Sequence, residues 1–455
     1  MAPDRLPPGS GDSDGKLPGL QPLPAPPGDL LTVPTTAEST HASESGRERR
    51  IIVPAIDGFR GLAALSVVLY HVCYAAGLPA LGGARSILMS GYMGVDFFFV
   101  ISGFVLFLPV VIAGGRFGDV RAYAVRRAAR IVPAYYVALV AVVILQPLLN
   151  PERTPLPWNT KAGALSFLVH LSFLQHSLGV LRGYPEGFIV LGVAWTLSLE
   201  VTFYVLLPVV ARWYFRHPFA GFAIAVVASV LWKIVATHAS ITVWFLPGTT
   251  STSLLRGTLV TQFPTYLADF AAGMTAAFLF VKWRRLGTLW LPRAAVAAQT
   301  VSIVVIVWTM RVGGLRDLAK TAGPYDHWTG TLPVGIAFAV LVLATALAPR
   351  WAQLPVANPA ARRLGDVSYG VYLWHSVVIG FALTTLHFSQ DATTGAFLRI
   401  LVVTLGASLL IGCASLVWVE QPVIAWARRR SRRIEERGGS GTSEPADTLK
   451  SQPLQ

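Results

Sequence analysis

Ten long apolar runs restrict what this sequence can fold into. Each is close to the ~20 residues that a helix needs to cross the hydrocarbon core of a bilayer. Lipid offers no hydrogen bonds to an open backbone, so we expect helices and an all-α fold class. The runs occupy residues 57–78, 92–113, 131–149, 188–212, 218–238, 261–281, 291–310, 331–348, 368–387 and 395–419. We therefore predict a polytopic transmembrane helix bundle of about ten spans, with the lipid bilayer as its partner.

The segments outside these runs have other compositions. The run 163–178 contains His170, Gln175 and His176 and is too short and polar to span, which predicts a re-entrant or interfacial helix. Residues 1–50 are rich in Pro, Gly, Ser and Asp without the apolar stretch of a secretory signal, so we expect a disordered cytoplasmic tail. The transmembrane domain is expected at 51–427, before a basic and then polar disordered cytoplasmic tail at 428–455.

Basic residues are distributed unevenly over the loops. Alternate loops hold nineteen lysines and arginines, and the opposite loops hold eight. Cytoplasmic loops are enriched in Lys and Arg, so we predict that the richer set and both termini lie on the cytoplasmic side of the plasma (inner) membrane. The net charge of +14 arises from these clusters, so nucleic acid is not an expected partner. Cys73 and Cys413 lack the spacing of a disulfide framework or a zinc site, and no metal is expected.

An arginine and a histidine share one face of the first run. Eleven residues separate Arg60 from His71, which places them about 16 Å apart along a helix axis. An ionisable group inside a bilayer is costly, which makes His71 a functional candidate. The alternative is a histidine that only packs between helices.

The fourth run contains a stripe of polar residues that includes the carboxylate of Glu200. Thr196, Glu200 and Tyr204 repeat at i, i+4 and i+8, so they share one face of a helix. Such a stripe must face protein or a watery cavity. It can stabilise the bundle through hydrogen bonds between helices, or it can take part in proton transfer. A carboxylate and an imidazole in a dry site can adjust each other's protonation, so we take His71 and Glu200 as the candidate catalytic pair.

Two further polar groups lie at the ends of runs. Asp96 is near the outer end of the second run, where it could support the site or complement the start of its helix. Gly103 lies one heptad further on and would permit close helix approach.

Another polar stripe lies near a cytoplasmic end and consists of Ser368, Tyr372 and His375. Tyrosines at a membrane interface can also serve as anchors, which is the alternative explanation of this stripe. The residues expected to surround the site are Asp96, Ser198, Tyr204, Tyr372 and His375.

Arginines at the cytoplasmic side form a candidate anion site. Arg127 and Arg130 are i, i+3 neighbours at the start of the third run, and Arg60 reaches the same membrane face. The alternative is that these arginines only set the orientation of the chain in the membrane, which is enough to explain most basic clusters. Three converging guanidinium groups, however, suit the phosphates of a ligand whose far end reaches His71.

These residues together resemble a known family, the acyltransferase 3 family of membrane O-acyltransferases. The resemblance runs in order from about residue 55 to 425 and is carried by six motifs. They are Asp57-Gly-x-Arg60-Gly with His71, Gly94-Val-Asp96 with Ser102-Gly103-Phe104, Arg127-x-x-Arg130-Ile-x-Pro133, Trp195-x-Leu-Ser198-x-Glu200-x-x-Phe-Tyr204, Ser368-Tyr369-x-x-Tyr372-Leu-x-His375, and Glu420-x-Pro422.

The resemblance implies transfer of an acyl group, often acetyl, from acyl-coenzyme A to a hydroxyl of a glycan, lipid-linked sugar or glycosylated natural product. It implies that His71 is catalytic and that Arg60, Arg127 and Arg130 bind the donor. The family often has a second acidic residue where this chain has Val201, which leaves Glu200 alone in that motif. Some members add an extracytoplasmic hydrolase-like domain; the segment after Pro422 is too short for one, so we expect a separate extracytoplasmic transferase as a possible partner.

The mechanistic hypothesis is direct transfer. His71 removes the proton of an acceptor hydroxyl, and Glu200 orients His71 and stabilises its imidazolium. The alternative function is a proton-coupled transporter of a small polar solute, since intramembrane His and carboxylate residues also build proton relays. No inverted repeat is visible to favour it, and a pure scaffold would leave the polar clusters unexplained.

Overall fold

Every regular element in the described part of the chain is a helix. The computed structural model describes residues 53–149, 161–177, 191–237, 257–318 and 331–439. The helices are α1 Ala55–Ala75, α2 Gly83–Met89, α3 Gly94–Ile112, α4 Val120–Leu149, α5 Lys161–Leu171, α7 Trp195–Arg216, α8 Pro218–Thr237, α11 Leu267–Leu286, α12 Leu291–Leu318, α13 Thr331–Leu347, α14 Arg350–Ala357, α15 Pro359–Thr384, α16 Thr394–Ser415 and α17 Gln421–Gly439. Short turns lie at η1 Gly91–Met93, η2 Gly192–Ala194, η3 Phe263–Tyr266 and the π-type η5 Leu416–Glu420. The all-α prediction is confirmed.

Nine helical segments in these ranges are long and apolar enough to cross a membrane. They correspond to nine of the ten predicted runs. The remaining run, 331–348, forms α13, whose 17 residues make it shorter than the others. The protein is therefore a multi-pass membrane protein, and α13 is the span whose length is marginal.

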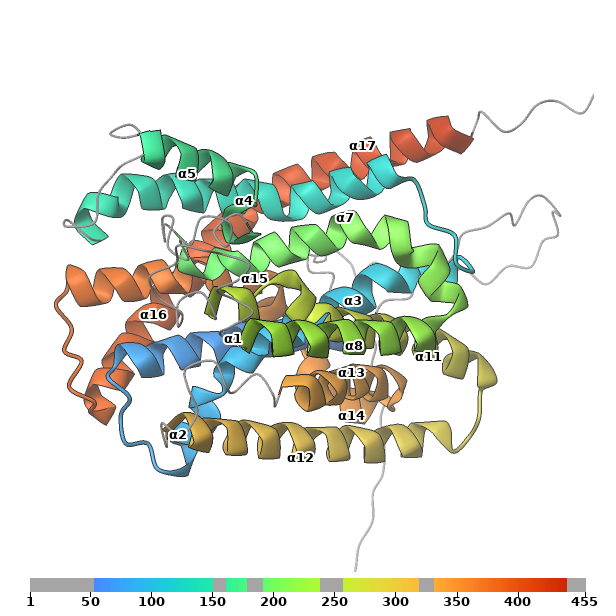
Figure 1. The fold of residues 1–455 in the computed structure, drawn as a ribbon, viewed down its shortest axis with the longest axis horizontal. Coiled ribbons are helices and arrows are strands. Elements are labelled where there is room, and N and C mark those ends of the chain that lie inside the picture. Colours follow the sequence, from blue (N-terminus) through green and yellow to red (C-terminus); the bar gives the residue numbers. More distant parts are fainter. Residues whose placement is uncertain (1–52, 150–160, 178–190, 238–256, 319–330, 440–455) are drawn as a thin grey trace, which may run out of the picture. The chain divides into compact units, whose positions relative to one another are not determined.

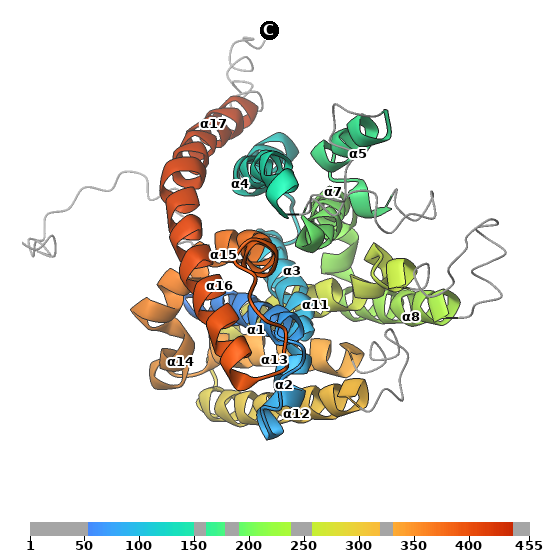
Figure 2. The same cartoon turned by 90° about the vertical axis from the view of Figure 1, so that its left-hand side faces the viewer.

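Four helices form the centre of the bundle. Helix α1 packs along α15, and α3 packs along α11 (Figures 1 and 2). Gly103 explains the second contact, because a Cβ there would lie 2.1 Å from the backbone oxygen of Phe270. Gly273 is its counterpart, with a Cβ 2.0 Å from the backbone oxygen of Val100. The close approach expected at Gly103 is thus present, and it needs glycine on both helices.

Helices α8 and α12 lie at the periphery of the bundle (Figure 2). Only 28% of the apolar window of α8 and 22% of that of α12 is buried, against 72% for α3 and α11. Large apolar side chains such as Leu231, Val304 and Trp308 are exposed there. Since an exposed apolar face is stable in lipid, these two helices supply the lipid-facing surface.

Helical structure extends beyond two of the predicted apolar runs, at the start of α4 and after the end of α16. Helix α4 begins at Val120, so Arg127 and Arg130 lie inside a continuous helix rather than at its start. Helix α16 continues through the π turn into α17, which runs beside α4 (Figure 1). The Arg126 guanidinium donates to the Glu435 carboxylate at 2.6 Å across this pair.

The expectation of a disordered tail from residue 428 is wrong for residues 428–439, which are helical. Their arginines are exposed, while Ala427 and Ser431 are buried. This four-residue spacing gives α17 a buried side against α4 that a composition-based prediction overlooks.

The short segment 163–178 falls partly in α5, whose 11 residues are too few to span a membrane. Residues 172–177 follow it, and the His176 imidazole bonds to the backbone oxygen of Thr261 at 2.9 Å. Burial lowers the pKa of His176 to about 4, so this imidazole is neutral at physiological pH. His176 therefore serves as a neutral contact between α5 and the chain before η3.

Candidate active site

A cavity of about 180 Å³ lies between α1, α3, α4, α7 and α15. Its walls combine aromatic and aliphatic side chains with a small number of charged groups. The charged groups that line it are Asp57, Arg60, Arg127, Arg130 and Glu200. Such a group of charges inside a membrane bundle is a functional site by default.

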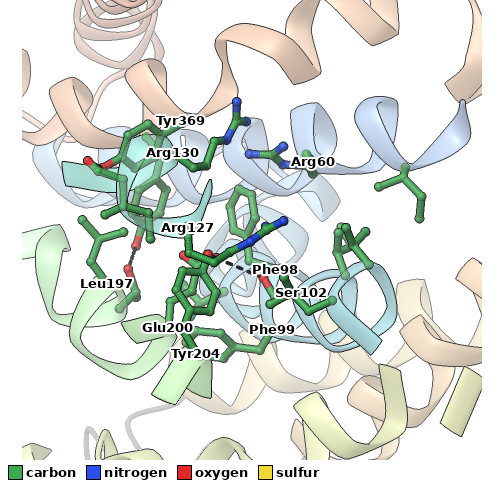
Figure 3. A pocket seen from close by; sticks show the side chains of 18 of the residues that line it. Arg60, Phe98, Phe99, Ser102, Arg127, Arg130, Leu197, Glu200, Tyr204 and Tyr369 are labelled. Carbon is green, nitrogen blue, oxygen red and sulfur yellow. Dashed lines mark hydrogen bonds between the residues drawn. The ribbon is translucent and has the colours of Figure 1, made fainter. Parts of the chain in front are cut away.

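The three arginines singled out in the sequence line this one cavity. Arg60 comes from α1, and Arg127 and Arg130 come from α4 (Figure 3). Arg60 lies close enough to interact electrostatically with both Arg130 and Glu200. Among the described residues none of the three arginines forms an ion pair, so their positive charge is not consumed by a protein carboxylate.

Arg127 is held by aromatic rings. Its guanidinium carbon lies 5.8 Å from the ring centroid of Tyr123 and 6.0 Å from that of Tyr204. Its Nε is buried and has no hydrogen-bond partner within the ranges described above. The faces of the two rings attract the cation, and the unused Nε donor is available to an anion.

The polar stripe of α7 faces the cavity as its spacing predicted. Thr196, Glu200 and Tyr204 all line it. The Glu200 carboxylate accepts from the Tyr204 hydroxyl at 2.5 Å and from the Ser102 hydroxyl at 3.3 Å (Figure 3). Two donors from α7 and α3 thus hold this carboxylate in place within the cavity wall.

Tyr372 and Phe98 lie on the same part of the cavity wall. Their rings pack edge to face with centroids 5.6 Å apart. The Tyr372 hydroxyl shares a 3.0 Å hydrogen bond with the Thr196 hydroxyl, which joins α15 to α7. The backbone oxygen of Tyr372 contacts Nδ1 of His375 at 2.6 Å. Tyr372 therefore connects the cavity to His375.

His71 and His375 form a contact that the sequence analysis did not predict. Nε2 of His375 lies 3.3 Å from Nδ1 of His71, and the ring centroids are 5.0 Å apart. Nδ1 of His71 also contacts the backbone oxygen of Val67 at 2.9 Å. His71 is partly buried and lies outside the lining of the cavity, whereas His375 is fully buried.

The direct pairing expected between Glu200 and His71 is not found in the described part of the chain. The partners of Glu200 are Ser102 and Tyr204, and the side-chain partner of His71 is His375. Glu200 and His71 lie on α7 and α1, whose relative rotation no sequence periodicity specifies. The imidazole of His375 occupies the place that the carboxylate was expected to take.

The other predicted residues lie around this site. Ser198 is buried on α7, does not line the cavity, and its hydroxyl has no hydrogen-bond partner among the described residues. Ser368 is buried and donates to the backbone oxygen of Gly365. Asp96 is buried in the first turn of α3, within electrostatic reach of Lys233 on α8. These three are neighbours of the site rather than parts of its surface.

Sequence reasoning missed Ser102 and Tyr369 as wall residues. Ser102 sits in the Ser-Gly motif, but a serine in an apolar helix usually bonds to its own backbone and gives no signal of a distant carboxylate partner. Tyr369 donates to the backbone oxygen of Ile131 at 2.9 Å and thereby joins α15 to α4. Within the described ranges no group of three or more His, Cys, Asp or Glu is placed to hold a metal ion.

The fold and site define a polytopic membrane protein with an arginine-lined cavity, whose wall residue Tyr372 contacts His375 of the His71–His375 pair. The acyltransferase domain of the acyltransferase 3 family matches residues 53–418, and the chain belongs to that family. The match covers α1 to the π turn, so it includes every cavity residue named above. The resemblance inferred from the six motifs is confirmed.

Several characterised proteins are similar over most of this chain. The peptidoglycan O-acetyltransferase OatA of Listeria monocytogenes is 26% identical over 396 residues, 83% of this chain and 56% of its own length. The exopolysaccharide production protein ExoZ of Rhizobium meliloti is 27% identical over 367 residues, 76% of this chain and 92% of its own. The O-acetyltransferase OatA of Staphylococcus aureus is 25% identical, covering 72% and 51%. This chain thus spans about half the length of the two O-acetyltransferases, and no solved structure matches it.

Proposed function

We propose that this protein is an integral membrane O-acyltransferase that transfers an acetyl group from acetyl-coenzyme A to a hydroxyl of a cell-envelope glycan or a glycoside. The observation that carries the proposal is the cavity lined by Arg60, Arg127 and Arg130, whose wall residue Tyr372 contacts His375 of the His71–His375 pair. Membership in the acyltransferase 3 family supports the reaction class. The names of the similar proteins support a carbohydrate acceptor.

In this proposal the three guanidinium groups bind the phosphates of the donor. Arginine binds phosphate oxygens through two parallel N–H donors, which gives both strength and orientation. The arm of the donor then follows the cavity to Tyr372 and Phe98, next to His375. We propose that the basic loops are cytoplasmic, that both termini lie on that side of the plasma membrane, and that the cavity is reached from there.

The transfer step uses His71 as general base. The imidazole takes the proton of the acceptor hydroxyl while the hydroxyl oxygen bonds to the thioester carbonyl carbon. The carbon–sulfur bond breaks, and the departing thiolate receives the same proton from the imidazolium. The products are the O-acetylated acceptor and free coenzyme A thiol, and His71 returns to its neutral state.

Glu200 has a different role from the one expected. Its carboxylate holds Ser102 and Tyr204 and lies in electrostatic reach of Arg60. We propose that it orders the polar wall on which the donor lies, and that His71 does not depend on it directly. Glu200→Gln keeps an acceptor oxygen for Tyr204 and should raise the donor KM more than it lowers kcat.

The experiment is transfer from radiolabelled acetyl-coenzyme A to a panel of glycans and glycosides, with the full chain in lipid nanodiscs. We expect labelled product with the wild type and a loss of about 10²- to 10⁴-fold in kcat with His71→Ala, which removes the base. His217→Ala is the matched control, because His217 is exposed and ends α7. Wild-type turnover in His71→Ala would overturn the assignment of His71.

The same preparation tests whether His71 carries the acyl group itself. Incubation with labelled donor and no acceptor, followed by peptide mass spectrometry, would detect an acyl-histidine. Direct transfer predicts no label on residue 71. A labelled His71 would instead indicate two half-reactions, in which a separate extracytoplasmic transferase could receive the group.

A further inference from the structure

The His71–His375 contact constrains where the protons of both rings lie. A backbone carbonyl oxygen can only accept a hydrogen bond, so a ring nitrogen in hydrogen-bond contact with one must carry a proton. Nδ1 of His375 contacts the backbone oxygen of Tyr372 at 2.6 Å. Nδ1 of His71 contacts the backbone oxygen of Val67 at 2.9 Å. Both Nδ1 atoms are therefore N–H groups.

The contact between the two rings then has one consistent direction. Nδ1 of His71 already carries its proton, so Nε2 of His375, 3.3 Å away, must be the acceptor. A proton on that Nε2 would place two N–H groups face to face. Such a ring would also be an imidazolium in a fully buried position, where a charge without a counterion is costly. His375 is accordingly neutral, and its lone pair points at His71.

The remaining atom is Nε2 of His71. No carboxylate among the described residues contacts His71, so a charge on this partly buried ring would lack a counterion and the neutral form is favoured. In the neutral ring the single proton lies on Nδ1, so Nε2 has a free lone pair, which is the form that a general base or nucleophile requires. The single Nδ1–H of His71 is shared between the Val67 backbone oxygen and Nε2 of His375. We propose that His375 is a positioning residue that, together with the Val67 oxygen, holds His71 in the Nδ1–H tautomer and presents unprotonated Nε2 to the acceptor hydroxyl. This inference deepens the proposed function and rests on it for its catalytic meaning.

The supporting framework comes from three helices. The Tyr372 backbone orients the His375 ring, and the Tyr372 hydroxyl is tied to Thr196 on α7. Val67 and His71 are one turn apart on α1, so the helix itself supplies the second acceptor. In serine-protease triads a buried carboxylate selects the tautomer of the catalytic histidine. Here a neutral imidazole and two backbone oxygens do so, which keeps a net charge out of the bundle.

The direct test is the tautomer of His71, measured by solid-state nitrogen NMR on full-length protein with ¹⁵N-labelled histidine in nanodiscs. His71→Gln identifies the His71 signals by their loss. We expect Nδ1 of His71 protonated and Nε2 unprotonated in the wild type. A wild-type His71 protonated on Nε2 would overturn the proposal. This readout does not need acyl transfer, so it separates failure of the tautomer assignment from failure of the proposed function.

The matched variants are His375→Leu, which removes the acceptor, and His375→Gln, whose side-chain oxygen can still accept from Nδ1 of His71. His375→Leu leaves the Val67 backbone oxygen as the remaining acceptor for Nδ1 of His71. We expect this variant to hold the Nδ1–H tautomer less completely than the wild type and to lower kcat about 10-fold or more, with the donor KM within about twofold of wild type. His375→Gln should recover much of the loss. Equal kcat values and an unchanged tautomer in His375→Leu would contradict the proposal. If His375→Leu does not fold, the comparison of wild type with His375→Gln decides.

Discussion

Arg127 is the cavity residue on which the proposed donor site can be tested most directly. Its guanidinium lies within cation–π distance of the rings of Tyr123 and Tyr204, and its Nε has no protein hydrogen-bond partner among the described residues. A buried N–H group without a hydrogen-bond partner is unfavourable, and a bound anion would supply that partner. The position of Arg127 therefore favours a role in ligand binding over a purely structural role. The aromatic rings restrict its rotation and so lower the entropy lost on binding.

Replacing Arg127 by Lys tests this directly. Lysine keeps the charge but loses the planar pair of donors, and a hydrogen bond to a charged group is worth about 1.5–3 kcal/mol. We expect the acetyl-coenzyme A KM to rise roughly 10-fold or more while kcat changes little. Arg121→Lys is the control, since Arg121 is exposed on the same helix and does not line the cavity. Equal changes in KM for the two substitutions would show that Arg127 does not bind the donor.

Between helices, the contact of α3 with α11 depends on two glycines. Gly103→Ala would place a methyl group against the backbone oxygen of Phe270, which cannot move aside without shifting α11. We expect a loss of at least about 1–3 kcal/mol of stability, seen as a lower Tm in detergent. Gly406→Ala on α16 is the control, because no atom lies within 4 Å of its Cβ position. A Tm for Gly103→Ala at or above that of Gly406→Ala would refute the close contact.

Helix α8 is joined to the bundle through a buried charge. Lys233 is 3% exposed and lies in electrostatic reach of Asp269 on α11 and Asp96 on α3. Lys233→Met leaves two buried carboxylates without their cation, and removing one partner of a buried pair costs about 3–5 kcal/mol. We expect a large fall in Tm, partly restored in the Lys233→Met, Asp269→Asn double variant. Lys282→Met, at an exposed lysine of α11, should leave the Tm unchanged.

For the molecule as a whole, the number of crossings decides on which side the termini lie. The described residues hold nine long helices and the shorter α13, and these give an even number of crossings only if α13 crosses. We expect both termini in the cytoplasm, as the basic loops indicate. Fusions of a cytoplasm-active fluorescent protein to each end should both fluoresce, and periplasm-active phosphatase fusions should both be inactive. A phosphatase signal at one end alone would mean that α13 does not cross.

Much of this architecture follows from local pattern. Apolar runs of bilayer length must become helices because lipid cannot satisfy an open backbone, so the fold class and nearly all spans are readable from residues. The i, i+4, i+8 spacing of Thr196, Glu200 and Tyr204 likewise predicts a shared face, and they do line one cavity. The helical region 428–439 escaped prediction because a basic composition conceals its narrow buried side.

The partners across helices were decided by tertiary packing. His71 and His375 are 304 residues apart, and which of several buried polar groups meets His71 depends on how α1 and α15 are rotated against each other. Helical periodicity specifies a face but not the neighbour that covers it. The sequence therefore indicated the residues of the candidate site, while the tertiary arrangement of α1, α7 and α15 set Glu200 in the cavity wall and His375 beside His71.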